Sequence, residues 1–278
     1  MSLITITSVF GSGGEKIAEQ VAKELGFELF DDHKIQDRAI EMGLSSDDLD
    51  GLDEKAPRLF DRLFTSKPAK YLDLLGSIVY DISSKGEGVI IGHGAHLFLR
   101  GFNCALHILI HASEETRKAK LVQEQNMSEE KALQLIRRMD KRQEDFVQYT
   151  FHRDWKDPSA YDLVFNLDNL GAEWAARLIV ELAKSDEIKE CSLTAMQEME
   201  LSSLKYKVEA ALVENELRDN LLAPTNNISV DVTEKGTVHL SGWVSSDHDR
   251  QRMMEVVKKV PGVTEVRSDV NVMPAHYA

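Results

Sequence analysis

A glycine-rich turn near the start of the chain, Gly11–Gly14, separates an apolar run from an amphipathic pattern. The run Leu3–Thr7 predicts a short buried strand, and Glu15–Leu25 carries its apolar residues at helical spacing. In such an arrangement, backbone N–H groups point at one spot and the helix dipole adds positive potential there. The pattern therefore predicts a phosphate cradle at Gly11–Gly14.

The predicted cradle lacks the lysine of the common phosphate-loop motif. That motif ends in Gly-Lys-Ser/Thr, whereas the matching stretch of this chain reads Gly13-Gly14-Glu15-Lys16. The chain thus has the expected architecture of a nucleotide site but lacks the lysine that usually supplies positive charge there.

Composition narrows the class of protein. A length of 278 residues suits two domains, and 42% apolar with 29% charged residues is typical of a soluble globular protein. The net charge of -14 disfavours nonspecific binding to nucleic acid or anionic membranes, because counterion release needs clustered Lys and Arg. We expect no nucleic-acid partner, and no apolar run approaches the length of a transmembrane segment.

The cysteines and the N-terminus suggest a cytoplasmic protein. Cys104 and Cys191 lie in different parts of the chain and form no metal-ligand spacing. We therefore expect no disulfide framework, and a reducing cytoplasm fits. The N-terminus has no basic leader or small-residue cleavage site and runs directly into the glycine turn, so it is interpreted as a core strand rather than a signal peptide.

Strand-like and helix-like patterns alternate through the first two thirds of the chain. The predicted strands are Leu3–Thr7, Phe27–Phe30, Gly88–Ile91, Ala105–Ile110 and Leu163–Asn166. The predicted helices are Glu15–Leu25, a helical region over 34–84 broken by 45–54, Pro57 and Pro68, a helix capped by Ser113, and helices near 128–145 and 172–183. This alternation predicts an α/β fold with a parallel sheet, helices on both faces and ligands at the strand ends.

The pattern changes towards the C-terminus. Residues 185–202 are polar and mixed in charge, and they are interpreted as a linker that a helix would also suit. Beyond it follow a helix through Leu204–Leu217, two alternating strands around Ile228–Val232 and Val238–Leu240 with a hairpin turn at 234–236, a helix near 247–259, and a strand through Val266–Val272. This order, αββαβ, predicts a small α+β domain. We divide the chain into residues 1–184, the linker 185–202, and residues 203–278.

Several stretches of the first domain carry a family resemblance. They are, in order, Ile6–Ile17 (ITSVFGSGGEKI), Val89–Ala95 (VIIGHGA), Ile110–Ala112 followed by Arg117, Arg138–Arg142 (RMDKR) and Arg153–Leu163 (RDWKDPSAYDL). This series resembles the cytidylate kinase-like family over residues 3–183. The resemblance implies a P-loop kinase fold with a helical lid. It also implies transfer of the γ-phosphoryl group of ATP to a nucleoside monophosphate, with Mg²⁺ and with a cytidylate-like acceptor favoured.

On this resemblance, the glycine loop and the first helical turn hold the nucleotide. The implied residues are Gly11, Ser12, Gly13, Gly14, Glu15 and Lys16. Lys16 stands where the motif has its magnesium-binding hydroxyl. Either its charge serves the phosphates or it is a solvated lysine of the first turn, and the sequence leaves both open.

The resemblance also implies acceptor and magnesium residues after the second and third strands. Asp31 is the candidate magnesium ligand, although one of Asp31 and Asp32 would equally cap the next helix. Asp32, Arg38 and His93 are candidate substrate-binding residues. His93 stands where related sequences have an arginine, and Ser8-Val9 replaces another; both departures remove permanent positive charge.

The lid supplies the remaining candidates. Arg138, Arg142 and Arg153 fall where the family's lid closes over the phosphates, and the planar guanidinium suits phosphate oxygens. Asp140 is expected to orient a neighbouring arginine. Arg138 and Arg142 also fit a solvated charged helix face. Trp155 and Tyr161 are expected to pack in the core or lid rather than stack on a base.

Residues 203–274 resemble a BON domain. The motifs are Lys207–Leu212, Ile228–Val230, Gly236–Val244 (GTVHLSGWV) and Val260–Val263 (VPGV). BON domains are associated with binding, so the resemblance implies a binding or regulatory module whose ligand, protein partner or self-association into a homo-oligomer is left open. The departures at Ser8, Lys16 and His93 also keep a rival open, namely a noncatalytic nucleotide sensor or scaffold.

Overall fold

A computed structural model describes residues 3–42, 68–188, 190–217 and 227–273 of the chain. The predicted helix breaks at 45–54 and Pro57 lie outside these residues. The chain divides into two compact units. One comprises residues 1–37 and 85–196, and the other comprises residues 38–84 and 197–278. Each unit is described by itself.

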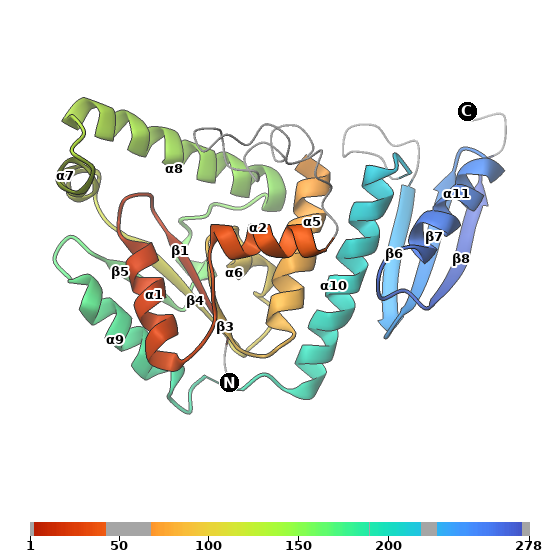
Figure 1. Ribbon diagram of the computed structural model, residues 1–278, viewed down its shortest axis with the longest axis horizontal. Coiled ribbons are helices and arrows are strands. Elements are labelled where there is room, and N and C mark those ends of the chain that lie inside the picture. Colours follow the sequence, from red (N-terminus) through yellow and green to blue (C-terminus); the bar gives the residue numbers. More distant parts are fainter. Residues whose placement is uncertain (1–2, 43–67, 189, 218–226, 274–278) are drawn as a thin grey trace. The chain divides into compact units, whose positions relative to one another are not determined.

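The first unit is built on a parallel sheet of five strands (Figure 1). The strands are β1 (Leu3–Ser8), β2 (Leu29–Phe30), β3 (Gly88–Ile91), β4 (Ala105–His111) and β5 (Leu163–Asn166). Their order is β2-β3-β1-β4-β5, and every neighbouring pair is parallel. The predicted parallel sheet is confirmed, and the loops that follow β2, β3 and β1 lie along one edge of it.

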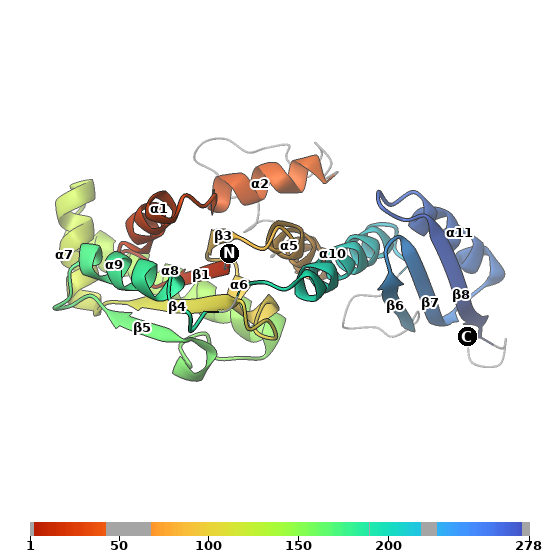
Figure 2. The ribbon, with the colours of Figure 1, turned by 90° about the horizontal axis from the view of Figure 1, so that it is seen from below.

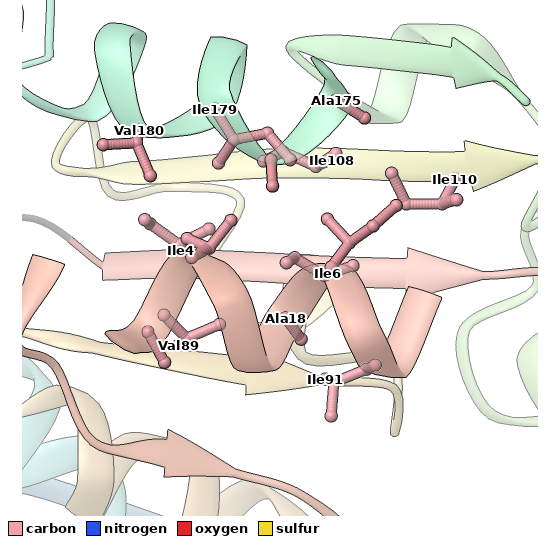
Figure 3. Close-up of a cluster of buried hydrophobic side chains, with 14 of the residues drawn as sticks. Ile4, Ile6, Ala18, Val89, Ile91, Ile108, Ile110, Ala175, Ile179 and Val180 are labelled. Atoms are coloured by element: carbon pink, nitrogen blue, oxygen red, sulfur yellow. The ribbon is translucent and has the colours of Figure 1, made fainter. Parts of the chain in front are cut away.

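One face of the sheet is covered by α1 (Gly14–Leu25) and α9 (Ala172–Ala183). Figure 3 shows Ile4 and Ile6 of β1 at the centre of this layer, between strand residues of β3 and β4. From the helices, Ala18, Ala175 and Ile179 pack onto it, all fully buried. Packing in this apolar layer fixes the position of the turn between β1 and α1.

The opposite face is partly polar. It is covered by α6 (Ala95–Phe98), by α8 (Glu129–Phe151) and by the segment that holds Trp155 and Tyr161. Both aromatic residues are buried in a core cluster, as their predicted packing role requires. Thr7 Oγ1 lies 3.1 Å from Nδ1 of the buried His96, whose ring stacks on Tyr161. Helices therefore cover both faces, as predicted.

Three further elements border the sheet. These are α2 (Asp32–Glu41), α7 (Glu114–Gln125) and a short 3-10 turn, η1 (Pro158–Ala160). Ser113 caps α7, since its side chain accepts a hydrogen bond from the N–H of Thr116. The second strand is shorter than predicted, and α8 runs to Phe151 rather than ending near 145. Helix ends depend on the packing around them, so their exact position is hard to predict from local sequence.

The second unit contains a three-stranded sheet (Figure 2). Its C-terminal elements are α10 (Leu193–Glu214), β6 (Asn227–Glu234), β7 (Thr237–Val244), α11 (Asp247–Lys258) and β8 (Glu265–Val272). β6 pairs antiparallel with β7, and β8 pairs parallel with β7. This order is the predicted αββαβ. Helix α10 begins at Leu193, so the segment interpreted as a linker is partly helical.

The second unit also includes α5 (Pro68–Ser83), which packs against α10. The buried Ser203 hydroxyl donates to the Ser77 carbonyl over 2.9 Å. Lys207 lies 3.4 Å from Asp81, and the rings of Tyr80 and Tyr206 stack 5.7 Å apart. Helix α5 lies far from α10 in sequence, yet the two belong to one compact body.

The structure overturns the expectation for the cysteines. Cys104, buried just before β4, forms a disulfide with Cys191, which precedes α10. The two residues are 87 positions apart in sequence, and only the folded chain brings their Cα atoms to 4.9 Å. Cysteine usage therefore no longer favours a reducing compartment, and a cytoplasmic location stays a prediction. Within the described residues, none of the helices is both long enough and apolar enough to span a membrane.

Candidate functional site

The loop between β1 and α1 has the backbone of an anion-binding nest. Gly11 and Gly13 are left-handed, with φ of +79° and +98°, and Ser12 between them is not. Such alternation turns successive N–H groups towards one concave side. The N–H groups of the first turn of α1 point the same way and lack intrahelical partners. The loop and helix start thus offer several donors to one anion.

A buried hydroxyl marks the same loop. Ser12 is only 5% exposed, and its Oγ has no hydrogen-bond partner among the described residues. Leaving a buried hydroxyl unpaired is unfavourable, so such groups usually serve a ligand or an ordered water. The donor set of the loop therefore fits the phosphates of a nucleotide.

Two cations of α7 hold the outer side of the loop. Arg117 donates to the Phe10 carbonyl over 3.2 Å, and Lys120 Nζ donates to the Ser12 carbonyl over 3.0 Å. A Cβ atom built on Gly13 would collide with the Lys120 ammonium, so that charge lies directly against the loop. A positive charge therefore lies beside the glycine loop, and helix α7 rather than the loop supplies it.

Lys16, the predicted candidate for that charge, points elsewhere. Its Nζ donates to Glu124 of α7 over 2.7 Å, and its side chain is largely exposed. This hydrogen bond raises the pKa of Lys16. Glu15, beside it, is exposed in the first turn of α1.

The loops after β2 and β3 bring Asp32 and His93 together. His93 Nε2 lies 2.8 Å from Asp32 Oδ1, and the histidine side chain is largely buried. Gly92, His93 and Gly94 are all left-handed, a run that is strained at the histidine. Asp31 has a different role, because its Oδ1 accepts the N–H of Lys34 over 3.0 Å and so caps α2.

Arg38 is held by two carboxylates of the second unit. It contacts Glu41 at 2.6 Å and Asp81 of α5 at 3.0 Å. The hydrogen bond to Glu41 is the main cause that raises the pKa of Arg38. A role for Arg38 at an acceptor phosphate stays a prediction; its buried Nε has no hydrogen-bond partner among the described residues.

The residues predicted for the lid fall into two groups. One consists of arginines, and the other is Asp140, which pairs with a buried arginine. Arg138 and Arg142 are exposed on α8. Asp140 forms a two-pronged hydrogen bond with Arg117, at 2.8 and 2.9 Å, so the arginine it orients is one of α7. Arg153 lines a hollow of about 380 Å³ with Gln148, Trp155 and neighbouring residues.

Two observations bear on a metal. No group of three or more His, Cys, Asp or Glu side chains within the described ranges is arranged to hold an ion. Mg²⁺ in phosphoryl-transfer sites takes one or two carboxylates and otherwise phosphate and water oxygens. Asp31 and Asp32 are two carboxylates at this edge of the sheet; Asp32 is held by His93, and Asp31 already caps α2.

The sequence matches a family model over more than half of its length. The model of the cytidylate kinase-like family matches residues 3–169, which span the glycine loop, the Asp32–His93 pair and the lid. The chain belongs to the cytidylate kinase-like family. A BON-domain model matches residues 207–274, within the second unit. Among curated protein sequences, none matches the chain.

Solved structures share the fold of the cytidylate kinase-like domain. An uncharacterised protein from Eubacterium ventriosum has 20% identity and a TM-score of 0.52, with 66% of this chain and 97% of that chain covered. Shikimate kinase from Bacteroides thetaiotaomicron has 15% identity and a TM-score of 0.41, covering 66% and 99%. Gluconokinase from Sinorhizobium meliloti has 14% identity and a TM-score of 0.37, covering 71% and 93%. The first likeness shows the fold alone, and the other two are too distant to carry an argument.

Sequence reasoning missed two residues of this site, Arg117 and Lys120. Arg117 was named only as part of a family motif, without a role in the site, and Lys120 was not predicted. Both follow the capped start of α7 at Ser113, three residues apart and therefore on one helix face. The sequence signal for both is a pair of basic residues on the helix that follows β4. That helix matters because β4 lies beside β1 in the sheet, and β1 leads into the glycine loop.

Proposed function

We propose that this chain transfers the γ-phosphoryl group of ATP to a nucleoside monophosphate, with a cytidylate-like acceptor, and uses Mg²⁺. The carrying observation is the left-handed glycine loop at the start of α1 with the unpaired, buried Ser12 hydroxyl. Phosphoryl transfer needs mainly positioning and charge neutralisation. The N–H groups of Gly11 and of residues 13–16 would hold the donor phosphates, whereas the N–H of Ser12 donates to the Val9 carbonyl over 3.1 Å.

The second part of the site supports a reacting centre rather than a bare phosphate cradle. Asp32 and His93 are held together at the edge of the sheet where the loop after β1 also lies. We assign Asp32 and His93 to the acceptor and magnesium side. Arg138, Arg142 and Arg153 would approach the phosphates from α8 and the segment after it.

ADP release by the full chain tests the proposal. ATP and Mg²⁺ are combined in turn with CMP, dCMP, UMP and AMP, and ADP is measured by a coupled assay. We expect turnover to be highest with a cytidylate acceptor. Absence of ADP release with every acceptor, from protein with a cooperative unfolding transition, would overturn the catalytic proposal.

A second candidate function is a noncatalytic nucleotide sensor. It is favoured by Lys16, which Glu124 holds away from the loop, and by Ser8, which stands where related sequences have an arginine. A sensor is stabilised by ATP through binding to the folded state alone. Thermal stabilisation by ATP without ADP release would identify this function.

The BON domain is proposed as a binding or regulatory module. A hollow of about 140 Å³ lies within the second unit, between the hairpin turn at Lys235–Gly236, the loop at Pro261–Gly262, α10 and the end of α5. Lys207 and Asp81 are both in its wall. A small ligand there would contact α5 and the BON sheet together.

A further inference from the structure

The glycine loop has no lysine of its own, but the fold brings one to it. Lys120 lies on α7, more than 100 residues after the loop, and its Nζ is 3.0 Å from the Ser12 carbonyl oxygen. The ammonium also occupies the space beside Gly13, where a Cβ atom would stand. The position is half-buried, so solvent screens this charge less than that of an exposed lysine.

The contact leaves hydrogen-bonding capacity unused. An ammonium group has three N–H donors, and Ser12 O is the one acceptor found for Lys120 in the part of the chain that the structure describes. The nearby Glu124 is hydrogen-bonded to Lys16 instead. Two donors of Lys120 therefore remain for an anion at the loop, where the Ser12 hydroxyl also has no described partner.

Neighbouring side chains fix Lys120 against the loop. Arg117, one turn earlier on α7, is pinned by Asp140 and donates to the Phe10 carbonyl. Leu121 packs at van der Waals distance from the Gly11 position. This face of α7 is thus held in register with the loop. Within the described residues Lys120 forms no hydrogen bond or ion pair with a carboxylate, although Glu124, one turn later, is near enough for the two charges to interact.

We propose that Lys120 supplies the phosphate-binding ammonium that the loop itself lacks, contacting the terminal phosphates of a nucleoside triphosphate bound at Gly11–Gly14. The proposal rests on the proposed nucleotide site and names the residue that completes it. It predicts that the contribution of Lys120 is specific to phosphate, because the ammonium is held at the loop that would take the phosphates.

Calorimetric titration of the full chain tests this role. ATP and adenosine are each titrated into wild type, Lys120→Met, Lys120→Arg and, as the matched control, Lys118→Met, which removes a lysine of the same helix that pairs with Glu129 of α8. A hydrogen bond to a charged group contributes about 1.5–3 kcal/mol, so Lys120→Met is expected to weaken ATP binding roughly ten- to hundredfold. Adenosine binding should be unchanged, Lys120→Arg should recover most of the ATP affinity, and Lys118→Met should bind ATP like wild type.

Each other outcome overturns a distinct claim. ATP binding by Lys120→Met at wild-type strength refutes the role of Lys120 and leaves the nucleotide site intact. An equal loss of ATP and adenosine binding shows that Lys120 only shapes the loop, which also refutes it. Failure of Lys120→Arg to recover ATP binding does the same. If wild type itself binds no ATP, the proposed nucleotide site and the role of Lys120 fall together.

Discussion

Ser12 is the residue at which stability and function conflict most directly. Its hydroxyl is buried without a partner among the described residues, a state that lowers the free energy of unfolding. We predict that Ser12→Ala raises the unfolding free energy of the nucleotide-free protein by about 1 kcal/mol. The same substitution should weaken ATP binding. Chemical denaturation and ATP titration measure the two effects.

A matched control exists for this prediction. Ser83 on α5 also has a buried hydroxyl without a described partner. Ser83→Ala should stabilise the protein similarly and leave ATP affinity unchanged. A less stable Ser12→Ala protein, or one with unaltered ATP affinity, would show that the hydroxyl is not reserved for a ligand.

His96 makes stability depend on pH. Burial lowers its pKa from 6.5 to about 3, with smaller contributions from His107 and Arg100. The folded state therefore keeps His96 neutral, while the unfolded state takes up a proton below pH 6.5. Stability from this residue is complete above pH 6.5 and is lost as the pH falls towards 3, by about 2 kcal/mol at pH 5.

The measurement compares unfolding free energies at pH 7.5 and pH 5. His96→Phe keeps an aromatic ring against Tyr161 and removes the titrating group. We expect a smaller loss between the two pH values in this variant than in wild type. Burial also lowers the pKa of His107, so some acid sensitivity should persist. Equal losses in both proteins would show that His96 does not titrate as described.

At the scale of elements, a buried ion pair joins α7 to α8. Arg117 is buried and Asp140 is partly buried, so removing Asp140 leaves the buried charge of Arg117 uncompensated. We predict that Asp140→Ala lowers the unfolding free energy by about 3–5 kcal/mol. Chemical denaturation measures the loss.

The same two helices provide the control. Arg137 of α8 pairs with Glu114 of α7 at the exposed surface, at 3.1 Å. Arg137→Gln should change stability far less, because solvent screens exposed pairs. Similar effects of the two substitutions would mean that burial does not distinguish the pairs.

The disulfide between Cys104 and Cys191 is a second link between elements. It joins the start of β4 to the segment before α10. A disulfide restricts the unfolded chain, so reduction with dithiothreitol should lower the unfolding free energy by about 2–4 kcal/mol. Cys191→Ser should be insensitive to dithiothreitol. Two thiols that react freely in untreated, folded wild-type protein would contradict the bond.

The difference between what sequence predicted and what it missed follows from distance along the chain. The strands, the glycine turn and the Ser113 cap are encoded within a few residues, and they were predicted. The Cys104–Cys191 bond and the contact of Lys120 with Ser12 join residues 87 and 108 positions apart. Such pairs depend on which helix face meets which loop, and periodicity alone does not specify this.

At the scale of the whole molecule, the family match and the compact units divide the chain differently. The cytidylate kinase-like match covers residues 3–169 and so includes α5. Yet α5 packs against α10, which lies beyond that match, through Ser77–Ser203 and Asp81–Lys207. The predicted domain boundaries at residues 184 and 203 stay a proposal. The packing of α5 against α10 provides a test of them, because these boundaries separate the two helices.

We predict that a chain ending at residue 184 is less stable than the full chain. Such a chain keeps α5 but removes α10, so apolar surface of α5 is exposed to water. It also lacks Cys191 and therefore the disulfide, so both chains are compared in dithiothreitol. Thermal unfolding should begin at a lower temperature, and the truncated protein should bind a dye that reports exposed apolar surface. An unchanged transition without dye binding would show that residues 1–184 form an independent domain.

The central claim is that Gly11–Gly14 holds the phosphates of a nucleoside triphosphate with help from Lys120. A crystal structure of the full chain with Mg²⁺ and a nonhydrolysable ATP analogue tests it most directly. We predict phosphate oxygens within hydrogen-bond distance of the loop N–H groups, the Ser12 hydroxyl and Lys120 Nζ. A nucleotide bound elsewhere, with the loop free of phosphate, would contradict the claim.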